Sequence, residues 1–257
     1  MGLDKYAYRS KIAGIKAGSK IGFSGSLLIL CLILGSNLVS VLTILIMSGA
    51  TVLWGGMRSR TYAKLLMIPA AFLVTGVLTV IVNQFSGRSE TLFAIKIFGS
   101  FYGISAGSLR SGVTIFLKSL GAISCLYFFS LNTTMNAFLS LIRKKFPGVI
   151  VELMELIYRF IFVIWDEAVS IHIAQASRLG YRGFRNSIES LGELVTTIFI
   201  RAFRRVERVS VCLESRGFEG NFDFLIEEEK TSGPMKTAAV ISCALLLAVG
   251  ITERLLK

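Results

Sequence analysis

The sequence predicts an all-α integral membrane protein, with about five transmembrane helices and two long helices on the cytoplasmic side. Of its 257 residues, 53% are hydrophobic and 17% are charged, whereas a soluble domain carries about 25% charged residues. The 37 positions between Lys20 and Arg58 contain no charged residue, and one helical crossing takes about 20 apolar residues. The apolar runs are continuous, whereas the strands of a transmembrane β-barrel alternate. These observations exclude a soluble single-domain enzyme and a disordered chain.

Five apolar segments are assigned as spans. A tight turn at Gly35-Ser36-Asn37 separates the first two. The expected spans are residues 21–35, 38–57, 63–83, 110–131 and 235–253. The chain then divides into an N-terminal part with four spans (1–131), a cytoplasmic module (132–234) and a C-terminal transmembrane helix (235–257).

The segment between the third and fourth spans allows two interpretations. Gly99, Gly103 and Gly107 recur every four residues, which is the spacing of a helix-packing face. The charged residues at the start of the segment favour a glycine-rich external loop instead; they are Arg88, Glu90 and Lys96. Whether residues 91–108 enter the membrane is left open.

The charge distribution predicts the orientation. The net charge is +12, and Lys and Arg accumulate in cytoplasmic loops of membrane proteins. With the amino terminus inside, only four basic residues lie outside: Arg88, Lys96, Arg254 and Lys257. Arg110 and Lys118 fall on one face of the fourth span and are expected to face protein or water. No arginine-rich stretch is interleaved with aromatic residues as a groove for single-stranded nucleic acid requires, so nucleic acid is not an expected partner.

The cytoplasmic module is expected to contain two long helices, at about 149–178 and 186–216. The first has a narrow polar stripe on an otherwise apolar cylinder, which is typical of a helix buried in protein or lipid. The second carries an apolar stripe, an arginine-rich face and glutamates between them. Such a three-faced helix is suited to lying along a membrane surface or crossing a neighbour.

Both long helices end in the same way. Each ending has Ser-Arg, then a glycine within two residues, then an aromatic residue. The candidate site residues are Ser177, Arg178 and Gly180 in the first ending and Ser215, Arg216 and Gly217 in the second. One interpretation is two ordinary helix ends, closed by glycine with a cation in the last turn. The other is that each arginine projects beyond its helix and reaches an acidic pocket on a partner.

The chain resembles the transmembrane T components of energy-coupling factor (ECF) transporters, the CbiQ family. The resemblance covers most of the chain and is densest between Arg143 and Phe222. It is carried by Leu156-Ile157-Tyr158-Arg159-Phe160-Ile161-Phe162-Val163, Asp166-Glu167-Ala168, Arg178-Leu179-Gly180-Tyr181, Ser190-Leu191-Gly192, Phe199-Ile200-Arg201, Arg205-Val206-Glu207-Arg208 and Glu214-Ser215-Arg216-Gly217-Phe218. The run around Tyr158–Ala168 is most similar to the cobalt/nickel branch. Ser177 and Leu179 flank the first arginine, where the family often has Ala or Gly.

The resemblance implies a membrane-embedded coupling subunit without catalysis of its own, in the cell membrane of a prokaryote. Arg178 and Arg216 would end the coupling helices and dock in grooves of two cytoplasmic ATP-binding cassette ATPase subunits. These partners would bind and hydrolyse ATP, and this chain would bind no cofactor. A separate substrate-binding membrane subunit, of metal type and accompanied by a small accessory membrane subunit, would hold cobalt or nickel. Its movement would be linked to ATP hydrolysis through this chain.

The residues agree with an expected absence of catalysis, and several alternatives stay open. The sequence has no phosphate-binding GxxxxGK[ST] loop, a single histidine, His172, and four scattered cysteines. Within the family, the alternative is a T component that serves vitamin-type substrate subunits. Outside it, the alternatives are the permease of a conventional ABC importer, an integral-membrane enzyme using Asp166 and Glu167, and a pore lined by Arg110 and Lys118.

Overall fold

A computed structural model describes residues 4–85, 93–97, 100–104, 106–143, 145–218 and 233–255. The chain divides into two compact units, one formed by residues 1–138 and 228–257 and the other by residues 139–227. The helices of the first unit are α1 (Asp4–Arg9), α2 (Ala17–Leu34), α3 (Asn37–Leu53), α4 (Ser59–Ile81), α5 (Ala106–Asn132) and α9 (Gly233–Leu255). A short helix, α6 (Met135–Ile142), lies where the units meet along the chain.

The predicted helical membrane fold is confirmed, with a small sheet added between two of its helices. Among the described residues, four helices are long and apolar enough to cross a membrane, namely α2, α4, α5 and α9. The second expected span, α3, is apolar but shorter, with 17 residues. Gly35 ends α2 with a left-handed φ of 60°, and the Ser36 hydroxyl accepts a hydrogen bond from the Val39 amide at the start of α3. This turn separates the two helices where the sequence predicts it.

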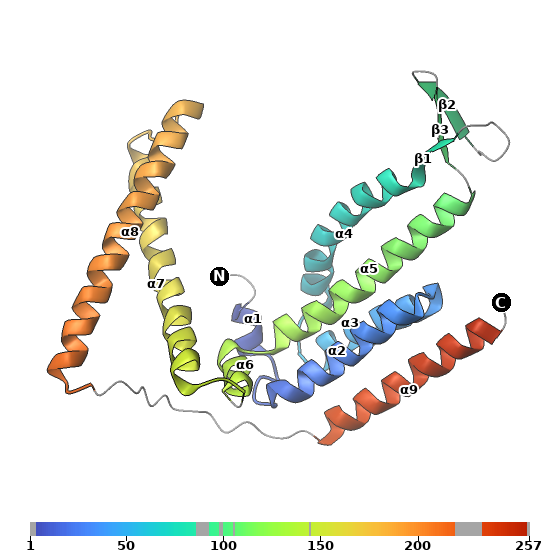
Figure 1. Cartoon of the computed structure of the whole chain (residues 1–257), viewed down its shortest axis with the longest axis horizontal. Helices are drawn as coiled ribbons and strands as arrows, with labels where there is room; N and C mark the ends of the chain where they lie inside the picture. Colours follow the sequence, from blue (N-terminus) through green and yellow to red (C-terminus); the bar gives the residue numbers. More distant parts are fainter. Residues whose placement is uncertain are drawn as a thin grey trace. The chain divides into compact units, whose positions relative to one another are not determined.

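The first unit is a helix bundle whose core lies between α2, α3, α5 and α9 (Figure 1). Its fully buried side chains include Leu27, Val39 and Met47. The rings of Phe23 and Phe128 meet edge to face, with their centroids 5.2 Å apart. Aromatic pairs of this geometry add to the energy of apolar burial. The helix α4 packs against α5.

A buried polar cluster joins the start of α2 to the end of α5. The Lys20 side chain is fully buried, and its amine donates to the carbonyl oxygens of Asn132 at 2.7 Å and Ala13 at 3.1 Å. The Asn132 side chain accepts from the Ser10 hydroxyl at 2.7 Å and donates to the Phe128 carbonyl at 2.8 Å. Since buried polar groups are costly unless they are hydrogen-bonded, this cluster fixes the N-terminal segment on the bundle.

A small sheet connects α4 to α5. It consists of β1 (Val82–Phe85), β2 (Phe93–Ile97) and β3 (Ser100–Ile104), antiparallel in the order β1-β3-β2. The interpretation of these glycines as one helix-packing face is wrong, because Gly103 lies in β3, opposite Asn83 and Ala94. The loop that the charged residues favour contains this sheet. Spacing by four residues aligns glycines only within one helix, and here a strand precedes the helix that contains Gly107. Gly99, Arg88 and Glu90 lie outside the described residues.

The two basic residues of the fourth span lie in the N-terminal half of a longer helix. The helix α5 begins at Ala106, four residues before the predicted span. A Cβ added to Gly35 would lie 4.0 Å from the Lys118 amine, so Lys118 reaches the turn at which α2 ends. Arg110 is two turns nearer the sheet and is exposed. Lys118 therefore lies beside the turn that joins α2 to α3.

The second unit contains the two long helices predicted for the cytoplasmic module. They are α7 (Gly148–Ser177) and α8 (Phe184–Ser215), which form an antiparallel hairpin (Figure 1). Pro147 precedes α7 with a φ of −54°, which suits a residue just before a helix. Lys144 and Lys230, two of the basic residues of the module, lie outside the described residues.

Candidate functional site

Gln175 is the centre of the joint between α7 and α8. Its side-chain amide donates to the Ser190 carbonyl at 3.0 Å and accepts from the Tyr181 hydroxyl at 2.9 Å. The Ser190 hydroxyl donates to the Gly180 carbonyl at 2.8 Å. The rings of His172 and Tyr181 are in contact, with centroids 4.5 Å apart. The turn that follows Arg178 is thus held by side chains from both helices.

Further along the hairpin, Arg205 of α8 forms an ion pair with Glu167 of α7 at 3.4 Å. Both side chains are partly exposed, at 38% and 28%, so the pair is worth at most about 1 kcal/mol. Glu167 therefore has a structural partner on α8. Asp166, the other acidic residue of the enzyme alternative, accepts a hydrogen bond on its backbone oxygen from Ser170.

The two helix endings share one backbone motif. In the first, the Gly180 amide donates to the Gln175 carbonyl and the Leu179 amide to the Ala176 carbonyl. In the second, Phe218 donates to Leu213 and Gly217 to Glu214 in the same pattern. This pair of hydrogen bonds defines the Schellman motif. Arg178 and Arg216 occupy the equivalent capping position, one residue past the end of each helix.

The six predicted site residues take corresponding places in the two endings, except for the glycines. Arg178 and Arg216 are exposed. The hydroxyls of Ser177 and Ser215 donate to backbone carbonyls of their own helices. Gly217 occupies the left-handed position with a φ of 70°, as expected for a glycine that follows a helix.

Gly180 does not have the role expected for the glycine of the first ending. The left-handed position there belongs to Leu179, with a φ of 61°. Gly180 follows it and lies against α8, where a Cβ would come within 2.7 Å of the Ser190 hydroxyl oxygen. The first glycine is thus required for close approach of the two helices and the second for backbone conformation.

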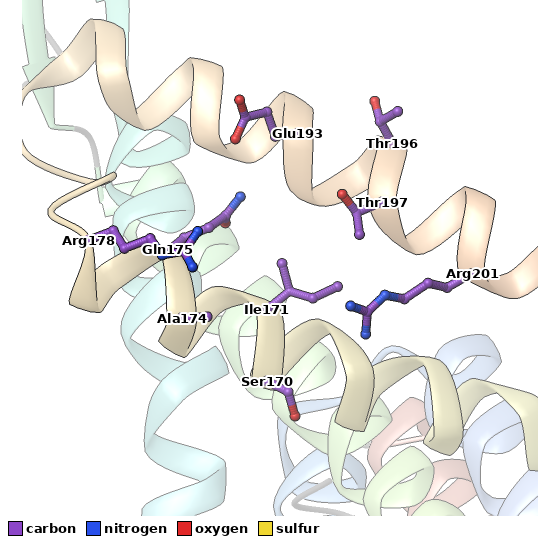
Figure 2. A pocket seen from close by; sticks show the side chains of 9 residues that line it. All are labelled: Ser170, Ile171, Ala174, Gln175, Arg178, Glu193, Thr196, Thr197 and Arg201. Atoms are coloured by element: carbon purple, nitrogen blue, oxygen red, sulfur yellow. The ribbon is translucent and has the colours of Figure 1, made fainter.

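A groove of about 550 Å³ lies between α7 and α8 next to the first ending. Figure 2 shows Ile171 of α7 and Thr197 and Arg201 of α8 pointing into the space between the helices. Arg178 and Gln175 line the end of the groove nearest the turn. Arg178 thus lines one end of this groove and is also exposed to solvent.

Large apolar side chains of α7 are exposed along one face of the helix. They recur at intervals of three or four residues and include Ile150, Leu153, Ile157, Ile161 and Trp165. Trp165 is 54% exposed in the chain alone. An exposed apolar stripe of this length is typical of a surface that meets lipid or another protein.

Sequence reasoning did not identify the residues that hold the joint. Gln175 and Ser190 are single polar residues on different helices, and their pairing depends on how α7 and α8 pack. In the sequence, Tyr181 is the aromatic residue of the first ending, and nothing there indicates that its hydroxyl pairs with Gln175. Within the described part of the chain, no three His, Cys, Asp or Glu side chains come together in a way that could hold a metal ion.

Comparison with known proteins gives consistent matches. A family model described as "Cobalt transport protein" (CbiQ) matches residues 15–225. A Methanocorpusculum labreanum protein whose name is that of a fused cobalt transport protein, CbiMQ, is 30% identical over 99% of this chain and 42% of its own length. The cobalt transport protein CbiQ of Salmonella typhimurium is 27% identical over 86% of this chain and 98% of its own length. The energy-coupling factor transporter transmembrane protein EcfT of Staphylococcus aureus is 29% identical over 46% of this chain and 48% of its own length.

Proposed function

The chain belongs to the CbiQ family of cobalt transport proteins, and we propose that it is the coupling subunit of an ECF-type importer for cobalt or nickel. In this proposal it has no catalytic activity and binds no cofactor. Two cytoplasmic ATPase subunits bind and hydrolyse ATP, and a separate membrane subunit holds the metal. The chain transmits movement between them through α7 and α8.

The observation that carries the proposal is the pair of arginine endings. Both arginines are exposed and cap their helices with the same backbone geometry. The 32 residues of α8 give it a length of about 48 Å, and one ending precedes α8 while the other terminates it. A single pocket does not reach both ends of a helix of this length, so the arrangement suits two ATPase subunits.

The chemistry of arginine suits such docking. A guanidinium offers a planar fork of donors that binds a carboxylate through two hydrogen bonds. When an arginine of this kind is desolvated in an interface, truncation commonly costs about 2 kcal/mol or more. Truncation of an exposed arginine away from the endings, such as Arg204, is expected to cost less than about 1 kcal/mol of binding energy.

The apolar stripe on α7 supports the second part of the proposal, contact with a membrane partner. The stripe is exposed in the chain alone, and the fused CbiMQ relative extends well beyond the part that matches this chain. A smooth apolar surface has no fixed hydrogen bonds to break, so a substrate-binding subunit could move along it.

Replacement of Arg216 tests the proposal. The full chain is expressed with its ATPase subunits and purified through a tag on this chain. We expect Arg216→Ala or Arg216→Glu to lower the amount of ATPase that co-purifies or to uncouple ATP hydrolysis from metal uptake. Arg216→Lys should restore docking only partly, because an ammonium lacks the planar fork. The double change of Arg178 and Arg216 should be worse than either single change.

The matched control is Arg204→Ala, which removes the same charge from an exposed position of α8. It should leave co-purification unchanged. If the Arg216→Glu protein assembles with its ATPase subunits and supports transport at the normal rate, Arg216 is an ordinary helix cap and the docking role is rejected.

A further inference from the structure

The two endings differ at the residue that takes the left-handed conformation. Gly217 has that conformation in the second ending, and Leu179 has it in the first. A left-handed φ is readily adopted by glycine and is unfavourable for a residue with a Cβ. For a bulky residue such as leucine it is a clear outlier. Leu179 is the one non-glycine residue with a positive φ in the described structure.

The backbone on both sides imposes this conformation. The Gly180 amide donates to the Gln175 carbonyl at 2.9 Å, and the Arg182 amide donates to the Leu179 carbonyl at 3.0 Å. The close approach of Gly180 to Ser190 fixes the next residue against α8. Gly180 is therefore needed for the close contact with α8, and the unfavourable left-handed conformation falls to Leu179.

The fold does not account for a leucine at this position. Its side chain is 62% exposed, so it adds little to the core of the hairpin. The apolar contact that often accompanies a Schellman motif joins two other positions, which are Leu213 and Phe218 in the second ending. In the first ending these positions are Gln175 and Gly180, and the Gln175 side chain is used in hydrogen bonds.

We infer that Leu179 is a docking residue that determines the specificity of the first ending. Its side chain inserts into an apolar notch of the ATPase subunit beside the acidic groove that receives Arg178. This inference rests on the proposed function. Residues held in sparsely populated backbone regions cluster at functional sites, and here the strained backbone holds an exposed leucine next to an exposed arginine.

The physical advantage of the pair is exclusion of water. An arginine–carboxylate contact is strengthened when surrounding apolar groups exclude solvent, as they do around interface hot spots. The second ending has glycine at the equivalent position and an aromatic residue, Phe218, after it. The two ATPase subunits therefore meet chemically different surfaces, with leucine directly after the arginine at only one of them.

Leu179→Gly provides a test in which the stability of the chain and its affinity for the ATPase subunits change in opposite directions. Glycine relieves the left-handed conformation, so the melting temperature of the purified full chain in detergent should rise. Removal of the side chain from the interface should weaken binding of the ATPase subunits, with a Kd about tenfold higher. Leu179→Ala should weaken binding to a similar extent without raising the melting temperature, because alanine keeps the unfavourable φ. A merely structural leucine would not produce this combination.

Val195→Ala is the matched control, since Val195 is 64% exposed on α8 of the same hairpin. It should leave the Kd for the ATPase subunits unchanged. If both Leu179 variants bind the ATPase subunits normally while Arg178→Ala binds them more weakly, the inference about Leu179 is overturned and the docking of this ending stands. Loss of binding in Val195→Ala as well would also overturn it, because the effect would not be specific to Leu179. If Arg178→Ala binds normally too, the proposed docking of this ending fails independently.

Discussion

The glycines of the two helix endings are required for different physical reasons, and their replacement should separate these reasons. In Gly180→Ala the new Cβ would meet the Ser190 hydroxyl oxygen at 2.7 Å and the Gln175 carbonyl oxygen at 3.0 Å. Overpacking of this kind typically costs about 1–3 kcal/mol. In Gly217→Ala no atom beyond the adjoining residues of the chain lies within 4 Å of the new Cβ, and the cost is the left-handed φ, about 1 kcal/mol. Thermal unfolding of the purified chain measures both.

A second substitution, Ser190→Gly, distinguishes the two causes when it is added to each glycine variant. Ser190→Gly should recover part of the stability lost in Gly180→Ala, because it removes one of the two close atoms. The same change should not improve Gly217→Ala, since Ser190 contacts the first ending and not the second. Equal effects of Ser190→Gly in the two backgrounds would contradict this assignment.

Within the membrane-spanning helices, Tyr127 compensates for a proline on its neighbour. Pro69 lies inside α4 and has no amide hydrogen to donate to the Leu65 carbonyl. The Tyr127 hydroxyl of α5 donates to that carbonyl at 3.2 Å, which satisfies a group that lipid cannot. We expect Tyr127→Phe to lower the stability of the chain in lipid or detergent by about 1 kcal/mol.

A double-mutant cycle provides the control for this pair. In Pro69→Ala the alanine amide can donate to Leu65, so the carbonyl no longer depends on Tyr127. Tyr127→Phe should then cost distinctly less in the Pro69→Ala background than in the native chain. If its cost is the same in both backgrounds, the hydroxyl does not act through the carbonyl freed by the proline.

For the whole molecule, the expected topology has five spans with the amino terminus inside and the carboxyl terminus outside. The distribution of Lys and Arg is its physical basis. Single cysteines at positions 5, 143 and 257 can be labelled from either side of the membrane, after replacement of Cys31, Cys125, Cys212 and Cys243. Positions 5 and 143 should react from the cytoplasm and position 257 from outside. Labelling of position 257 from the cytoplasm alone would rule out an odd number of spans.

The metal specificity of the complete transporter is also testable. Cells that carry this chain with its ATPase and substrate-binding subunits should accumulate radiolabelled cobalt or nickel, in a way that depends on ATP. Arg178→Ala combined with Arg216→Ala should abolish uptake while the chain stays in the membrane. Transport of a vitamin without metal uptake would reject the proposed substrate and would support the vitamin-type alternative.

The membrane fold and the two long helices followed from the sequence, because both depend on local chemistry. Uncharged apolar runs of about 20 residues are long enough to cross the bilayer as helices. Each of the two long helices ends where a glycine closely follows an arginine. The predicted ends, at 178 and 216, lie one residue beyond those of the structure. The sheet between α4 and α5 was missed, since its strands are short and are defined by pairing with each other.

The tertiary structure decided which residue does what at the candidate site. The sequence places a glycine in both endings, yet only packing against Ser190 distinguishes the role of Gly180 from that of Gly217. Likewise the joint at Gln175, the ion pair between Glu167 and Arg205 and the hydroxyl that caps Leu65 each connect different helices. The spacing of residues along one helix predicts its faces, but the neighbour that each face meets depends on how the helices pack.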